Sequence, residues 1–113
     1  MTLGQKQEAF SRAIPLLYLY AQYHGYQIRT GDAFRDPRLH GEIGEKEGYG
    51  HKDSCHKLKL AIDCNITKND YYLQGAAAKE AHNFLHDFWD MLNGSKRIPH
   101  DLNHYSFEHQ GMR

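Results

Sequence analysis

A run of nine residues, 58–66, constrains the fold of this 113-residue chain more than any other feature, because apolar and polar side chains alternate along it. Successive side chains of a β-strand point to opposite faces, so the run predicts a strand with one face packed on a core. The other face looks outward and carries an acid, Asp63, near its middle. The inward positions are Leu58, Leu60, Ile62 and Cys64, and the outward positions are Lys59, Ala61, Asp63 and Asn65.

Two amphipathic segments, 2–24 and 74–92, are expected to form helices. The first begins with Thr2, a residue type that caps helix N-termini, and closes at Gly25. Pro15 lies inside it and predicts a bend or a break into two shorter helices. The apolar stripe is Phe10, Ile14, Leu17 and Ala21 in the first segment, and Ala77, Ala81, Phe84, Leu85, Phe88 and Leu92 in the second.

Two further short strands are expected, at 26–30 and 104–108. Segment 41–50 contains four glycines and three glutamates, which predicts a mobile surface loop of the kind that often carries binding residues. Together these elements predict an α+β fold, in which helices pack on one side of a small, mainly antiparallel sheet. A chain of 113 residues has room for one modest core, so residues 1–113 are expected to form a single domain.

The composition argues against several classes of protein. Fourteen Lys and Arg balance fourteen Asp and Glu, whereas a protein that binds nucleic acid through a basic surface carries a positive charge. The longest apolar stretch, 13–20, is interrupted by Pro15 and is far shorter than the roughly 20 residues of a membrane span. The N-terminal residues lack the apolar core of a signal peptide, so synthesis in the cytoplasm is expected. Two cysteines are too few for a disulfide scaffold.

Nine histidines are a large share of so short a chain, and histidine is the commonest metal ligand. His56 stands seven residues before Asp63, and an odd separation would place them on opposite faces of one strand. His56 is therefore expected in the loop that enters the strand. Asp101 stands three residues before His104, which starts the last strand. If the two strands are close, two imidazoles and one carboxylate can converge on one ion. Such a set suits catalytic zinc, with a nearby unligated carboxylate as general base.

These residues also form a recognisable pattern. The arrangement Ser-x-His-x4-Ala-x-Asp, which runs from Ser54 to Asp63, is followed by the acid-x2-His pair at Asp101 and His104. This pattern resembles the zinc peptidases of the D-Ala-D-Ala metallopeptidase family. Segment 31–37, which contains Arg35, is similar to the aromatic-Arg segment of that family. The run 31–109 looks like the small phage-encoded members, which are L-alanyl-D-glutamate endopeptidases that serve as endolysins.

The resemblance implies a role for each of these residues. Asp101 would be the general base, and Arg35 would stabilise the oxyanion on the scissile carbonyl. Ser54 would form a hydrogen bond to a ligand or to the substrate. The implied zinc ligands are His56, Asp63 and His104.

Three positions depart from the family pattern. Many relatives have glycine in place of Lys59, and many have glutamate in place of Asp101, whose side chain is one methylene shorter. Cys64 follows Asp63 at a position where an apolar residue is expected.

The resemblance therefore implies a zinc-dependent peptidase that hydrolyses peptidoglycan stem peptides. The expected protein is a monomeric L-alanyl-D-glutamate endopeptidase, made in the host cytoplasm and acting in the periplasm after the membrane is opened. The alternative with the same chemistry is a D-alanyl-D-alanine carboxypeptidase. More remote alternatives are an inactive wall-binding relative and a metal-dependent nuclease.

The same residues have ordinary structural interpretations. His56 can be a loop histidine, Arg35 a surface ion-pair residue and Ser54 a turn residue. His82 and His86 stand four apart on the second helix, but the glutamate of a zincin His-Glu-x2-His motif is missing between them. We therefore interpret this pair as helix surface.

Three further alternatives are consistent with the sequence. Asp53 can replace Asp101 as the base. Cys55 and Cys64 can bind zinc or form a disulfide, although a buried Cys64 and a chemically ordinary Cys55 are favoured. Acids of the glycine-rich loop can hold calcium, although a solvated loop that gates the substrate is favoured. These acids are Glu42, Glu45 and Glu47.

Overall fold

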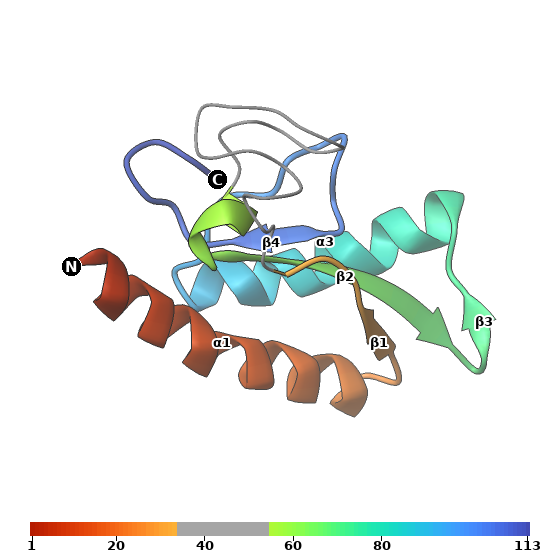
Figure 1. Cartoon of the computed structure of the whole chain (residues 1–113). Coiled ribbons are helices and arrows are strands. Elements are labelled where there is room, and N and C mark those ends of the chain that lie inside the picture. Colours follow the sequence, from red (N-terminus) through yellow and green to blue (C-terminus); the bar gives the residue numbers. More distant parts are fainter. Residues whose placement is uncertain (34–54) are drawn as a thin grey trace.

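Two helices pack against a small antiparallel sheet in the computed structural model, which describes residues 1–33 and 55–113 (Figure 1). The α+β class predicted from the sequence is confirmed. No helix in these two ranges is long and apolar enough to span a membrane. In chain order the elements are α1 (Leu3–Tyr23), β1 (Gln27–Thr30), the 3-10 turn η1 (Cys55–Leu58), β2 (Ala61–Lys68), β3 (Tyr71–Tyr72), α3 (Gly75–Met91) and β4 (His104–Ser106).

Helix α1 begins with the cap that its sequence predicts. The Gln5 backbone N–H donates to Thr2 Oγ1 at 3.1 Å, and the Thr2 N–H donates to Gln5 Oε1 at 2.9 Å. This reciprocal pair is a capping box, which satisfies two backbone donors at the helix end. Gly25 follows the last turn at φ +86°, a left-handed conformation that glycine adopts without strain. Both predicted ends of the helix are confirmed.

Helix α1 also continues through Pro15, so a break into two shorter helices is wrong. Proline leaves the carbonyl of Ser11 without its helical donor. Ser11 and Pro15 are both exposed, and water can bond to that carbonyl instead. Buried residues lie on both sides of the proline and hold the two halves on one core: Phe10, Ala13, Leu17 and Ala21.

Strand β2 is the centre of the sheet, because every other strand of the described residues pairs with it in antiparallel register. Strand β1 lies along one edge. Strands β4 and β3 both pair with the opposite edge of β2, one after the other. Alternate residues of a strand direct their backbone N–H and C=O groups to the same edge, and Cys64 and Ile66 are such a pair. On that edge the Cys64 N–H donates to the Asn103 carbonyl at 2.8 Å, and the Leu73 N–H donates to the Ile66 carbonyl at 2.9 Å.

Strand β2 begins at Ala61 rather than at residue 58, because 55–58 coil into η1 and the Leu60 N–H donates to the Cys55 carbonyl at 3.0 Å. Ala61, predicted to face outward, is buried where β4 pairs with this end of β2. The last strand ends at Ser106 rather than at residue 108. The predicted inward face is correct for Leu60, Ile62 and Cys64, which are buried.

Trp89 on α3 joins both helices to the sheet. Its indole is fully buried, and Nε1–H donates to the Ser106 carbonyl at 3.0 Å. The ring meets Phe10 of α1 edge-on at 6.0 Å and Tyr105 of β4 edge-on at 5.9 Å. Gly94 lies so close to the indole that a Cβ there would overlap the ring. The predicted stripe on this helix is correct in part: Ala81 and Leu85 are buried, Phe84, Phe88 and Leu92 are half-buried, and Ala77 is exposed.

Candidate metal centre

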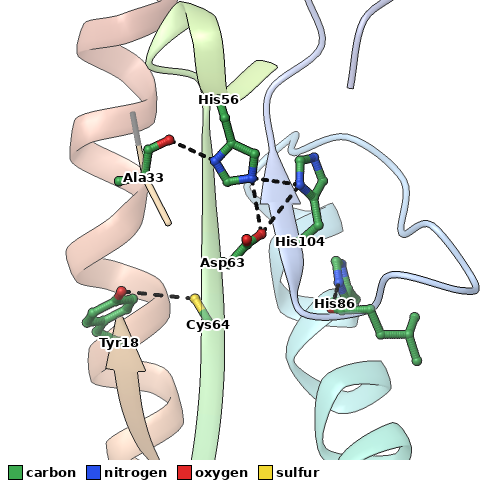
Figure 2. Close-up of polar contacts among 8 residues, drawn as sticks. Tyr18, Ala33, His56, Asp63, Cys64, His86 and His104 are labelled. Carbon is green, nitrogen blue, oxygen red and sulfur yellow. Dashed lines mark hydrogen bonds and ion pairs between the residues drawn. The ribbon is translucent and has the colours of Figure 1, made fainter. Parts of the chain in front are cut away.

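Three side chains from separate elements meet at the start of β2 (Figure 2). Strand β4 pairs with β2 so that His104 lies opposite Asp63, and η1 holds His56 just before the strand. His56 Nε2 lies 3.1 Å from Asp63 Oδ1 and 3.2 Å from His104 Nδ1, and His104 Nδ1 lies 3.6 Å from the same oxygen. The structure thus brings together the three residues that the sequence expects to converge, and their ligand atoms could hold a metal ion.

The orientation of the His56 ring is set by the backbone. His56 Nδ1 lies 2.7 Å from the Ala33 carbonyl, which can only accept a hydrogen bond, so Nδ1 carries the proton (Figure 2). In the neutral imidazole this leaves a lone pair on Nε2, which faces Asp63 and His104. A partner on the remote nitrogen that fixes the tautomer is typical of histidine ligands to metals.

Asp63 supplies the negative charge of the centre. Burial raises its pKa, but the close contacts of the carboxylate with His104 and His56 outweigh burial, and the pKa lies well below its usual range. The carboxylate is therefore ionised at neutral pH. A bound cation would be attracted by this charge and by the His56 and His104 ring nitrogens that lie beside it.

Asp101 precedes His104 by three residues in the sequence. Its carboxylate is not among the ligand atoms that cluster at the centre. It is exposed, and its backbone carbonyl accepts the His104 N–H at 3.1 Å. This turn fixes Asp101 at the entrance to β4. Other candidates fall outside the described residues: Arg35, Ser54, Asp53 and the 41–50 loop with Glu42, Glu45 and Glu47.

Both cysteines are buried and free, so they form no disulfide with each other. The Cys55 thiol lies 3.4 Å from the Phe107 carbonyl, and the Cys64 thiol lies 4.0 Å from the Tyr18 hydroxyl. Burial raises the pKa of Cys55 to about 11 and that of Cys64 to about 12. Both are therefore protonated at neutral pH, a form that binds metals poorly.

His82 and His86 are buried, which corrects their interpretation as helix surface. His82 Nδ1 lies 2.8 Å from the Tyr105 hydroxyl. The His86 side chain, labelled in Figure 2, donates its Nε2–H to the Leu102 carbonyl at 2.8 Å. The His86 ring also stacks on Tyr105 at 4.0 Å. Both histidines thus tie α3 to Tyr105 and the chain before it, and so support the neighbouring His104.

The two buried imidazoles predict a loss of stability in mild acid. Burial lowers the pKa of His82 and of His86 to about 4, from an ordinary value of 6.5. Below pH 6.5 the unfolded chain therefore binds protons that the folded chain does not. The free energy of unfolding should fall, as pH drops towards 4, by up to about 1.4 kcal/mol per pH unit for each histidine. Urea unfolding in the presence of a chelator, between about pH 7 and 5, measures this slope.

His100 offers a matched control because it is exposed. The slope of the unfolding free energy against pH reports how many more protons the unfolded chain binds than the folded chain. His86→Gln should lower that number by about one, and His100→Gln should leave it unchanged. Equal slopes for the wild type and His86→Gln would contradict the account of a neutral, buried His86.

Comparisons with family models, curated proteins and solved structures give no match to this chain. A functional proposal for this chain therefore depends on its own residues, chiefly on the cluster of His56, Asp63 and His104.

Proposed function

We propose that this chain is a zinc-dependent peptidase that hydrolyses the stem peptides of peptidoglycan. One observation carries the proposal: His56 Nε2, His104 Nδ1 and Asp63 Oδ1 form a triangle with edges of 3.1, 3.2 and 3.6 Å. The three residues come from the sequence pattern that resembles the D-Ala-D-Ala metallopeptidase family. Pattern and geometry thus support the same site.

Zinc suits this triangle better than magnesium or calcium. Ligand atoms that lie 2.0–2.1 Å from a tetrahedral zinc are about 3.3 Å apart, close to the edges observed here. Two imidazole nitrogens and one carboxylate oxygen are ordinary zinc ligands, whereas magnesium and calcium prefer oxygen alone. Three protein ligands would leave a fourth position for water or substrate, as catalytic zinc requires.

When bound, zinc would lower the pKa of a water molecule and polarise the peptide carbonyl. His56, Asp63 and His104 would hold the ion. The Asp101 carboxylate would accept a proton from the attacking water and pass it to the departing amine. The Arg35 guanidinium would stabilise the negative charge that develops on the carbonyl oxygen. Ser54 would donate a hydrogen bond to a ligand or to the substrate.

The proposed substrate bond is L-alanyl-D-glutamate, and the proposed setting is lysis by a phage endolysin that acts as a monomer. The enzyme would accumulate in the host cytoplasm and reach the periplasm when the membrane is opened. A D-alanyl-D-alanine carboxypeptidase would use the same chemistry. The products from a defined muropeptide distinguish them, because the first exposes a new D-glutamate amine and the second releases D-alanine.

Asp101→Asn is expected to slow muropeptide hydrolysis by about 100- to 10,000-fold, because asparagine cannot accept the proton. Bound zinc, measured in the same sample, should remain. Asp70→Asn is the matched control, with the same change in charge. Asp70 lies at φ +67° in the turn between β2 and β3, a conformation that asparagine tolerates.

Full activity of Asp101→Asn would show that another group is the base. Absence of hydrolysis by the zinc-loaded wild type would instead overturn the proposed peptidase activity and favour an inactive wall-binding protein.

A further inference from the structure

A cleft of about 340 Å³ opens on the edge of β2, between the places where β4 and β3 pair with that strand. Its walls include Asn65 and Ile66 of β2, Leu73 after β3 and Asn103 before β4. The first turns of α3 close it, and Figure 1 shows this end of α3 near β3. The cleft therefore lies where the sheet edge is interrupted.

The cleft adjoins the metal centre on two strands. Asn103 directly precedes His104, and Asn65 follows Asp63 by two residues on the same face of β2. Residues two apart on a strand are separated by about 6.6 Å, which is about the span of two residues of an extended peptide. A peptide whose reacting bond lies at the metal centre can therefore place a neighbouring residue in the cleft.

The polar groups in the cleft are suited to an anion. Lys79 and His100 contribute basic side chains, and none of the described residues that line the cleft is acidic. Helix α3 begins here without a side-chain cap on Gln74 and without an acid in its first turn. Its first backbone N–H groups therefore add a partial positive charge at this end.

His82 is a second, independent sign of a ligand. Its side chain lines the cleft but is only 6 % exposed. Nδ1 bonds to the Tyr105 hydroxyl, and the described residues provide no hydrogen-bond partner for Nε2. A ligand oxygen in the cleft would be a partner for a proton on that nitrogen.

We propose that this cleft binds a carboxylate of the peptide substrate, next to the bond that is cleaved, through Lys79, His82 Nε2 and His100. This inference rests on the proposed peptidase function and adds specificity for an anionic peptide. Two substrate carboxylates have this chemistry: the α-carboxylate of D-glutamate and the C-terminal carboxylate of D-alanine.

The test measures binding without turnover. Isotope-labelled full-length protein, kept free of metal by a chelator, is titrated with N-acetyl-L-alanyl-D-glutamate, its diamide and N-acetyl-D-alanyl-D-alanine. At least one of the two carboxylates should shift the backbone amide signals of Ala78, Lys79 and Asn103, and should bind about tenfold more tightly than the diamide. Lys79→Gln should remove that preference. Lys96→Gln, an exposed lysine outside the cleft lining, should retain it.

Each outcome decides the matter. Preference for the glutamate peptide supports the inference with an internal carboxylate as ligand, and preference for D-alanyl-D-alanine supports it with a C-terminal one. Equal binding of both acids and the diamide, or an unchanged preference in Lys79→Gln, overturns it. Because no hydrolysis is needed, carboxylate binding by a protein that fails to cleave muropeptides would overturn the peptidase function alone.

Discussion

Replacing His56 by glutamine is expected to weaken zinc binding by at least about 100-fold. Mutation of a residue that only hydrogen-bonds to a metal ligand already lowers metal affinity by about 10- to 100-fold, and loss of a ligand itself should cost more. His56 Nε2 is one corner of the triangle, and Nδ1 is committed to the Ala33 carbonyl at 2.7 Å. Glutamine can offer one oxygen in place of the nitrogen, but it cannot reproduce both contacts. Competition with a zinc-binding dye measures the affinity.

His24→Gln is the matched control, because His24 is an exposed histidine at the end of α1. Its affinity for zinc should equal that of the wild type. Zinc should also raise the thermal stability of the wild type and of His24→Gln, but not that of His56→Gln, because a ligand stabilises only the state that binds it. Equal zinc affinity in His56→Gln and His24→Gln would show that His56 is not a zinc ligand.

Trp89→Ala is expected to lower the free energy of unfolding by about 3–5 kcal/mol, a large part of the roughly 5–15 kcal/mol that holds a domain of this size folded. The fully buried indole contacts Phe10 and Tyr105 and donates to the Ser106 carbonyl. Alanine removes the packing from both helices and from β4 at once. Because β4 begins with His104, zinc affinity should fall as well.

Met91→Ala, on the exposed side of the same helix, should change the free energy of unfolding by less than about 0.5 kcal/mol. Trp89→Phe keeps an aromatic ring but loses the indole donor. Its loss of unfolding free energy should therefore lie between those of Met91→Ala and Trp89→Ala. Urea unfolding at neutral pH measures all three variants. A loss below about 1 kcal/mol in Trp89→Ala would contradict the central place of this residue in the core.

The fold class could be predicted because the signals for it are local. Alternation along 58–66 is a property of neighbouring residues, and so are the Thr2 cap and Gly25 at the ends of α1. The start of β2 could not be predicted, because η1 depends on the way the chain enters the sheet. The tolerance of Pro15 likewise depends on tertiary packing, with buried residues before and after it.

The candidate site depends on both local and distant relations. The odd separation of His56 and Asp63 placed His56 before the strand, where η1 holds it. The pairing of Asp63 with His104 joins residues 41 apart, so the residues alone give it only on the condition that the two strands are close, and the resemblance implies it. The bond from His56 to Ala33 uses a backbone carbonyl, so no side-chain pattern could indicate it.

The sequence of α3 carries a signal for the burial of His82 and His86. Each follows a buried residue of α3, Ala81 or Leu85, by one position. A residue one step along a helix is turned by about 100°, so a wide buried face includes it. Their partners on Tyr105 and Leu102 belong to a later part of the chain, and these contacts decide that the imidazoles are buried.

The zinc K-edge X-ray absorption spectrum of the protein, loaded with one equivalent of zinc, tests the proposed centre most directly. We expect scattering from two imidazoles and from oxygen ligands at about 2.0–2.1 Å, and no sulfur ligand. A sulfur ligand at about 2.3 Å would move the site to Cys55 or Cys64, and failure to retain zinc would contradict the proposed centre altogether.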